Sequence, residues 1–232
     1  MAPEDSLNPQ PSQGNLFAQP SMVEVTVFHE AITMGDTTTV ISYLNKYRKN
    51  EIVNVHNSLG VTALMKAAMG GNNDIITLLL ERGADIDLQN RGNDRATALM
   101  YAVLFDHKDT VMLLLDKGAD INAHTSHDWT ALMYSARGGH DGILTLLLTR
   151  GADSTAKNHL GQTALELAQA GYSAKAEAIL QQWPERQKQC IIRQKEQQNA
   201  EAAQDAAIAH LEKLRKHQSV KTALKKPPPP KP

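Results

Sequence analysis

The chain has few aromatic residues, one cysteine and no long apolar run. Phe, Trp and Tyr make up 4% of its 232 residues, so Leu, Ile, Val, Ala and Met must supply most of any core. That composition favours stacked small helices over a β-sandwich. The single cysteine, Cys190, excludes an internal disulfide and a cysteine-rich zinc site. No stretch approaches the roughly 18 consecutive apolar residues of a transmembrane helix, so we expect no membrane insertion.

The N-terminus and the charge distribution bear on where the protein works. The chain starts Met-Ala-Pro-Glu-Asp, without a basic segment followed by an apolar one, so no secretory signal is expected. The formal net charge is −1, but from Trp183 onward there are eleven Lys and Arg against five acids, and before it thirteen against twenty. A basic tail on an acidic body indicates two parts with different surroundings. We expect a soluble protein in the cytoplasm.

Two short sequence motifs, which we call phrases, recur along the chain. Thr-Ala-Leu-Met occupies residues 62–65, 97–100 and 130–133, and Thr-Ala-Leu-Glu occupies 163–166. Gly-Ala-Asp follows each of the first three, at 83–85, 118–120 and 151–153. Two phrases that keep a common spacing of 33 or 35 residues are the signature of a structural repeat.

Each unit reads as a turn followed by two helices. In the unit that starts at Asn57, Asn57-Ser58-Leu59-Gly60 has the composition of a turn. Thr62 is suited to cap the first helix, and Gly70-Gly71 to end it. A second helix is predicted from Asp74 to about Arg82.

These units resemble the ankyrin repeat, whose period is about 33 residues and whose signature is Thr-Pro-Leu-His-x-Ala. Here Ala replaces the proline, and Met65, Met100 and Met133 replace the histidine. We interpret these methionines as filling the core between repeats. The turn glycines, capping threonines and second-helix leucines of the family are matched by Gly60, Gly161, Thr62, Thr97, Thr130, Thr163 and the leucines at 78–80, 113–115 and 146–148.

The resemblance covers about residues 23–182 and implies an all-α fold. It predicts a solenoid of about five helix-turn-helix units with outer hairpin loops, followed by a C-terminal helix. The units are expected at about 22–56, 57–89, 90–122, 123–155 and 156–182. Residues 1–21 are expected to form a disordered leader, 183–218 a polar helix, and 219–232 a basic, Pro-rich disordered tail. The Thr-Ala-Leu-Met sequence is similar to that found in bacterial ankyrin repeat proteins.

Three units depart from the pattern. The first lacks the Thr-Ala-Leu-Met phrase, although apolar residues recur at helical spacing at positions 23, 27, 31 and 32. The third is two residues longer, in the hairpin at 90–95, and the extra length is either a binding loop or tolerated drift in a surface loop. In the fourth, Asp128 replaces the turn glycine.

No catalytic motif is present. We find no P-loop, no His-Glu-x-x-His and no Gly-x-Ser-x-Gly, so we expect neither an enzyme nor a cofactor. His124, His127, Asp128 and His140 have the side chains of metal ligands, but we interpret the first three as exposed on a hairpin and His140 as the start of a second helix. No aromatic residue follows Trp183 to stack on bases, so nucleic-acid binding is not expected.

The resemblance implies a protein partner held on the concave face that hairpin tips and first helices form together. The variable positions there lie just before each Thr and just after each Met, and Trp, Tyr and Arg dominate interface hot spots. The partner-binding candidates are Trp129, Tyr134, Tyr101, Arg137, Leu104, Phe105, Lys66 and Met69, with Ala96 beside them. Trp129 either contacts the partner or packs over its own hairpin.

Three functional hypotheses follow. The first is a non-enzymatic, monomeric protein-binding module. In the second, the repeats form an adaptor whose C-terminal helix and basic tail drive self-association or docking. In the third, the protein is a secreted bacterial effector that acts in the cytosol of a host cell, as the similarity to bacterial ankyrin proteins suggests.

Overall fold

The computed structural model describes residues 19–47, 51–92, 94–171 and 173–189, with residues 192–193, 195–198, 201 and 204 further on. Among these residues there is no β-strand, only an isolated antiparallel bridge between His124 and Thr130, so the predicted all-α fold is confirmed. The helices are α1 (Met22–Met34), α2 (Thr37–Lys46), α3 (Ala63–Gly70), α4 (Asn73–Glu81), α5 (Ala98–Leu104), α6 (Lys108–Asp116), α7 (Ala131–Gly138), α8 (Asp141–Thr149) and α9 (Ala164–Ala170). Helical residues follow at 174–189.

The chain divides into two compact parts, Met1–Gln181 and Gln182–Pro232. In the second part, residues 182–189 and the few described beyond them are helical. The rest of the polar helix expected over 183–218, the tail expected over 219–232 and most of the leader expected over 1–21 lie outside the described residues. The adaptor and effector hypotheses depend on that tail and stay predictions.

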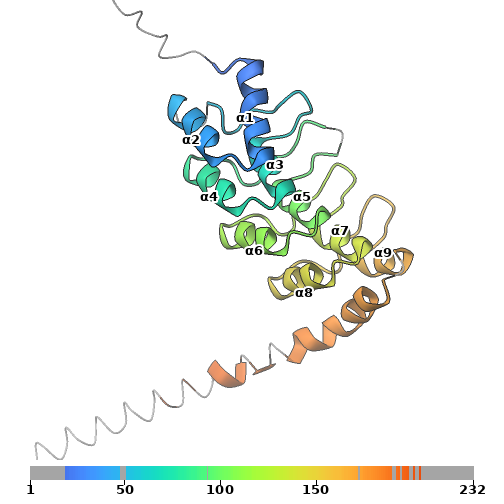
Figure 1. Ribbon diagram of the computed structural model, residues 1–232. Coiled ribbons are helices and arrows are strands. Elements are labelled where there is room, and N and C mark those ends of the chain that lie inside the picture. The colour runs from blue at the N-terminus through green and yellow to red at the C-terminus, as the bar shows by residue number, and fades with distance from the viewer. Residues whose placement is uncertain are drawn as a thin grey trace, which may run out of the picture. The chain divides into compact units, whose positions relative to one another are not determined.

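The helices of the first part form two rows (Figure 1). The first helices of successive units pack on one another, α1 on α3, α3 on α5, α5 on α7 and α7 on α9. The second helices α2, α4, α6 and α8 form a row beside them, and the hairpin loops project from the opposite side. A solenoid of helix-turn-helix units is therefore confirmed, with each unit in contact mainly with its neighbours.

The repeated Thr-Ala-Leu-Met phrase starts each first helix. Thr62 occupies the N-cap, and its hydroxyl accepts from the backbone N–H of Met65 at 3.3 Å. Thr130 and Thr163 cap α7 and α9 in the same way. Thr97 has the position and backbone conformation of a cap, but its side chain makes no capping bond.

The methionines of the phrase are buried in the core between units, as the sequence analysis expected. Met65, Met100 and Met133 are buried together with the Ala and Leu that precede them. The Met65 sulfur also accepts from the N–H of Thr62 at 3.4 Å. The sulfur thus accepts a hydrogen bond from the helix start while the rest of the side chain fills the core.

In four hairpins the residue two positions before the N-cap threonine of the first helix has a positive φ. Two are the predicted turn glycines, Gly60 and Gly161, with φ of 74° and 76°. In the third and fourth units Arg95 and Asp128 take up the same conformation, with φ of 55° and 58°. A non-glycine residue there is strained, and Asp tolerates the strain better than Arg.

Arg95→Gly is therefore expected to stabilise the protein. Removing the left-handed strain should outweigh the loss of an exposed hydrogen bond from Arg95 Nε to Gln89 and raise the free energy of unfolding by about 0.5–1 kcal/mol. Urea unfolding measures the difference. Asp128→Gly is the matched variant and should gain less; an equal or larger gain at Asp128, or a loss at Arg95, would contradict the argument.

In the first unit the apolar residues that recur at helical spacing are only partly buried. Val23 and Val27 are 73% and 38% exposed, whereas Val25, Phe28 and Ile32 are fully buried. The buried residues follow a stripe of α1 that faces α2 and α3, and positions 23 and 27 lie outside it. The helical spacing was correct, but its apolar residues do not all belong to the core.

A ladder of side chain to backbone hydrogen bonds joins successive hairpins. The Asn54, Asp87 and Asn122 side chains accept from the next unit's backbone N–H at Asp85, Asp120 and Asp153, each at 2.9 Å. Of these three acceptor side chains, Asp87 is the one with a carboxylate. Burial raises its pKa, and the charges of Asp120 and Asp85 add to the shift.

Candidate protein-binding surface

The position that ends each first helix gives a common register. Gly35, Gly71 and Gly139 end their helices in the left-handed conformation, and Asp106 adopts it in the third unit. Counting back five and two residues from each gives eight side chains that are half-buried or exposed. We call them the first-helix face: Glu30, Thr33, Lys66, Met69, Tyr101, Leu104, Tyr134 and Arg137.

An aromatic–arginine cluster lies at the fourth unit on this face. The rings of Trp129 and Tyr134 lie 5.1 Å apart between centroids, and the Arg137 guanidinium lies 5.3 Å from the centre of the Trp129 ring. Such aromatic and cation–π contacts contribute about 0.5–1.5 kcal/mol each. Arg137 makes no ion pair with any described residue. Trp129 therefore packs on Tyr134 of α7, half-buried, and holds the cation of Arg137 in place.

The long hairpin of the third unit is bonded to the neighbouring tyrosine. The Asn90 amide donates to Tyr101 Oη at 2.7 Å and to Asp94 Oδ1 at 2.8 Å. Burial raises the pKa of Tyr101 and of Tyr134, and the nearby Asp94 carboxylate adds to both shifts. The lengthened hairpin thus places the Asp94 charge near enough to two tyrosines to raise their pKa values, which the sequence analysis did not predict.

The other candidates lie on the two preceding helices. Leu104 and Phe105, at the end of α5, are each 51% exposed. Lys66 and Met69 are half-buried on α3. The structure therefore brings Trp129, Tyr134 and Arg137 into direct contact and distributes the other five candidates along α3 and α5.

Ala96 is a correction, since it is buried rather than exposed. Val61, at the same position of the second unit, is buried too. These short side chains are buried, whereas the longer Trp129 at the equivalent position is half-buried. Residues at this position thus contribute to the surface only when they are large.

The hairpin histidines are surface residues, as the sequence analysis expected. His124 and His127 are exposed, with His124 Nδ1 3.5 Å from Asp128 and the His127 ring 5.0 Å from that of His159. His140 precedes α8 and pairs with Asp106 at 3.2 Å. Within the described part of the chain, no three His, Cys, Asp or Glu residues are arranged to hold a metal ion.

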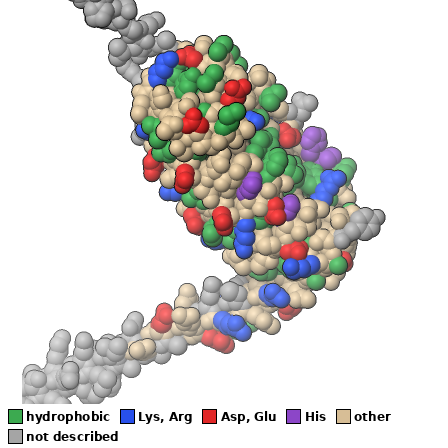
Figure 2. All heavy atoms as spheres, viewed as in Figure 1, with side chains coloured by type: hydrophobic (Ala, Val, Ile, Leu, Met, Phe, Trp, Pro, Cys, Tyr) green, Lys and Arg blue, Asp and Glu red, His purple; other side chains and the backbone are tan. Residues whose placement is uncertain are grey.

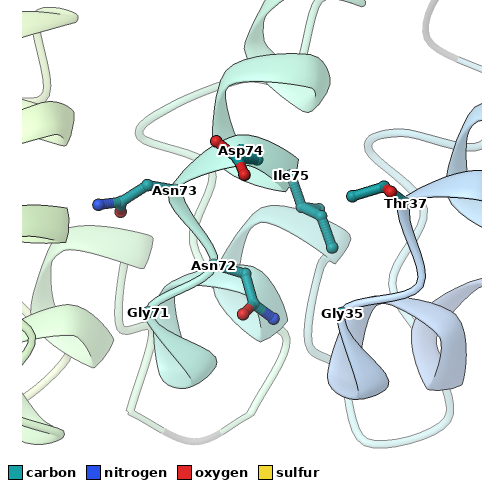
Figure 3. Close-up of a pocket in the computed structure, with 7 residues that line it drawn as sticks. All are labelled: Gly35, Thr37, Gly71, Asn72, Asn73, Asp74 and Ile75. Atoms are coloured by element: carbon teal, nitrogen blue, oxygen red, sulfur yellow. The ribbon is translucent and has the colours of Figure 1, made fainter.

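A hollow of about 310 Å³ lies where α4 begins, between the first two units (Figure 3). Its asparagines are already bonded to neighbouring units. Asn72 donates to the Ile32 carbonyl at 2.9 Å, and Asn73, which extends away from Thr37 in Figure 3, accepts from Thr110 at 2.7 Å. These side chains join units together, so we assign the hollow no ligand.

Charge alone marks no site on the face of the described residues that Figure 2 shows. On the face that Figure 2 shows, acidic and basic side chains of the described residues are interspersed without a large area of one sign. None of the described helices combines the length and the apolar character that crossing a bilayer requires.

The profile of a family described as "Ankyrin repeats (3 copies)" matches residues 28–125 and 86–158, and these matches together span more than half of the chain. The chain belongs to the ankyrin repeat family. Ankyrin repeats indicate a protein–protein interaction module, and in this one the aromatic–arginine cluster is formed by α7 and the hairpin before it.

Two curated relatives match a part of this ankyrin chain. It is 39% identical over 66 residues to a Notch-regulated ankyrin repeat-containing protein A of Danio rerio, covering 28% of this chain and 59% of that one. It is also 39% identical over 66 residues to a Notch-regulated ankyrin repeat-containing protein of Xenopus tropicalis, covering 28% and 58%. The chain thus spans less than two thirds of the curated relatives that it matches.

Proposed function

We propose that this ankyrin chain is a non-enzymatic binding module that holds a protein partner on a concave face formed by its first helices and hairpins. The chain acts as a monomer in the cytoplasm, and it supplies no catalytic group of its own. The observation that carries the proposal is the aromatic–arginine cluster of Trp129, Tyr134 and Arg137.

Three properties of the cluster support a role in binding. Its residue types are those enriched at interface hot spots. Its side chains are held by mutual stacking, so a partner would immobilise few additional rotamers on binding. The Arg137 charge has no carboxylate partner among the described residues, and Leu104 and Phe105 leave apolar surface exposed on the neighbouring helix. A partner that covers Arg137 together with Leu104 and Phe105 would bury apolar area around the Arg137 charge, which a carboxylate of the partner can neutralise.

The double variant Trp129→Ala/Arg137→Ala tests the proposal. The probe is a set of peptides selected from a random-sequence phage-display library on the full-length wild-type chain, then synthesised with a fluorophore. Loss of a hot spot of at least about 2 kcal/mol should weaken their binding about 30-fold in fluorescence anisotropy.

Arg150→Ala is the matched control. Arg150 lies at the end of α8, in the row of second helices, and pairs with Asp116 at 2.7 Å. That variant should bind as the wild type does, and both variants should keep the wild-type helical circular dichroism. Peptides that bind the double variant as tightly as the wild type would exclude the cluster as the binding site.

A further inference from the structure

The lengthened hairpin of the third unit has a carboxylate where two other hairpins have an exposed leucine. Asp94 lies three residues before the N-cap threonine, as Leu59 and Leu160 do in the second and fifth units. Those two leucines are 72% and 67% exposed, whereas Asp94 is half-buried. A half-buried carboxylate at this position needs a structural account.

Hydrogen bonds hold Asp94 beside the aromatic–arginine cluster. The amide nitrogen of Asn90 donates both to Asp94 Oδ1 at 2.8 Å and to Tyr101 Oη at 2.7 Å, so the carboxylate and this phenol meet at one donor. The Asp94 carbonyl accepts from the N–H of Ser126 at 2.8 Å, in the hairpin that carries Trp129. Asp94 is therefore fixed between the first helix of the third unit and the hairpin of the fourth.

No described cation neutralises Asp94. Of the two arginines in its own hairpin, Arg95 donates from Nε to Gln89 Oε1 at 2.9 Å, and neither Arg91 nor Arg95 forms an ion pair with Asp94. At the cluster, Arg137 likewise makes no ion pair with any described residue. The surface thus holds one carboxylate and one guanidinium that are paired neither with each other nor with another described residue.

Both charges lie near the ring of Tyr134. That ring packs on Trp129 at 5.1 Å, and the Arg137 guanidinium lies 5.3 Å from the centre of the Trp129 ring. Burial raises the pKa of Tyr134, the Asp94 charge adds to the shift, and the Arg137 charge opposes it. The two opposite charges therefore border one half-buried aromatic surface, where a partner that excludes water would strengthen electrostatic interactions.

We infer that the protein partner presents a basic side chain to Asp94 and an acidic side chain to Arg137. Asp94 Oδ2, which accepts no hydrogen bond from a described residue, is available to a Lys or Arg of the partner. The Arg137 guanidinium stacks by its face on Trp129, and its N–H groups are available to a carboxylate.

Charge complementarity selects this pair of side chains rather than a net charge. The Asp94 and Arg137 charges cancel in sum, so a partner with a single charge gains one attraction and meets one repulsion. A partner with two opposite charges in the correct order gains both attractions. The inference rests on the proposed function and adds the charge pattern of the partner.

The experiment uses peptides selected from the random-sequence phage-display library on the full-length wild-type chain and synthesised with a fluorophore. We expect them to carry one Lys or Arg and one Asp or Glu at a recurring spacing. Exchanging these two residues within a peptide keeps its composition and net charge but brings each charge to a like one. The exchange should weaken binding at least about tenfold in fluorescence anisotropy.

Two variants assign each peptide charge to one residue of the chain. Asp94→Asn removes a charge and keeps an acceptor for the Asn90 amide, and Arg137→Gln removes the other charge. Neutralising the basic residue of the peptide should cost about tenfold on the wild type and nothing further on Asp94→Asn. Neutralising its acidic residue should cost about tenfold on the wild type and on Asp94→Asn, and nothing further on Arg137→Gln.

Asp116→Asn and Arg150→Gln are the matched controls. These residues carry the same two charges in the row of second helices, where they pair with each other at 2.7 Å. On both control variants, neutralising either charge of the peptide should cost as much as on the wild type.

The outcomes separate this inference from the proposed function. Peptides that need Trp129 and Arg137 but lose no affinity when their charges are neutralised or exchanged would overturn the inference and leave the proposed function standing. A cost of the basic residue that persists on Asp94→Asn would place that residue elsewhere and overturn the inference too. If the wild type selects no peptide at all, the proposed function fails and the inference with it. Should Arg137→Gln lose its circular dichroism, Asp94→Asn and the exchanged peptides still decide.

Discussion

Acidification should lower the free energy of unfolding of the His29→Met variant by about 3 kcal/mol less than that of the wild type. Burial lowers the pKa of His29 from 6.5 to about 4, outweighing the Val55 carbonyl, and the charges of Lys66 and His56 add to the shift. The folded protein therefore resists protonating a ring that the unfolded chain protonates readily. The stability due to the neutral ring is fully present above about pH 6.5 and is lost as the pH falls toward 4.

Urea unfolding at pH 7.5 and at pH 4.5 measures this effect. The wild type should lose stability between the two, and His29→Met should lose about 2.5 kcal/mol less, because carboxylates that titrate in both proteins cancel in the comparison. At pH 7.5 the free energies of unfolding of the two proteins should agree within about 1 kcal/mol, since methionine is buried at the equivalent position of three other units. Equal losses of stability on acidification would show that the ring is not kept neutral by burial.

Leu99→Ala should lower the free energy of unfolding by about 3–4 kcal/mol, within the range measured for buried Leu→Ala changes. Leu99 is 1% exposed on α5, which packs on α3 and on α7. The change therefore opens a cavity at a helix with neighbours on both sides. Because units of a solenoid are stabilised mainly by adjacent units, the urea transition should also become broader.

Leu104→Ala is the matched control on the same helix. Leu104 is half exposed, and its replacement should change stability by no more than about 0.5 kcal/mol. Circular dichroism during urea unfolding reports both variants. Similar losses at the two positions would contradict the separation of α5 into a buried side and an exposed side.

Features that depend on local sequence were predicted well. The capping role of Thr62, the helix end at Gly71 and the burial of Met65 follow from residue type and spacing, and the structure has all three. The left-handed turn was equally local, since Asp128 adopts the conformation of the glycine that it replaces.

Contacts of single side chains with residues distant along the chain were not predicted. The stacking of Arg137 on Trp129 requires knowing that a hairpin residue lies over the last turn of the following helix. Asn57, whose amide nitrogen lies 3.4 Å from His29 Nδ1, comes from the next unit. The first unit lacks the repeated phrase, so only counting back from Gly35 reveals that His29 occupies the position that Met65, Met100 and Met133 take in the next three units. Sequence spacing predicts the scaffold, whereas side-chain contacts between hairpins and helices determine the surface.

The ladder between hairpins has a further consequence for the response of the stack to acid. At the joint between the second and third units the acceptor is the Asp87 carboxylate, whereas at the joints before and after it the acceptors are the neutral amides of Asn54 and Asn122. Burial raises the pKa of Asp87 and the charges of Asp120 and Asp85 add to the shift, while the hydrogen bond from the Asp120 N–H lowers it. Burial thus disfavours the very charge that the hydrogen bond across this joint favours. Three joints of the same geometry therefore differ in kind: protonation changes the acceptor of one and leaves the acceptors of the other two as they are.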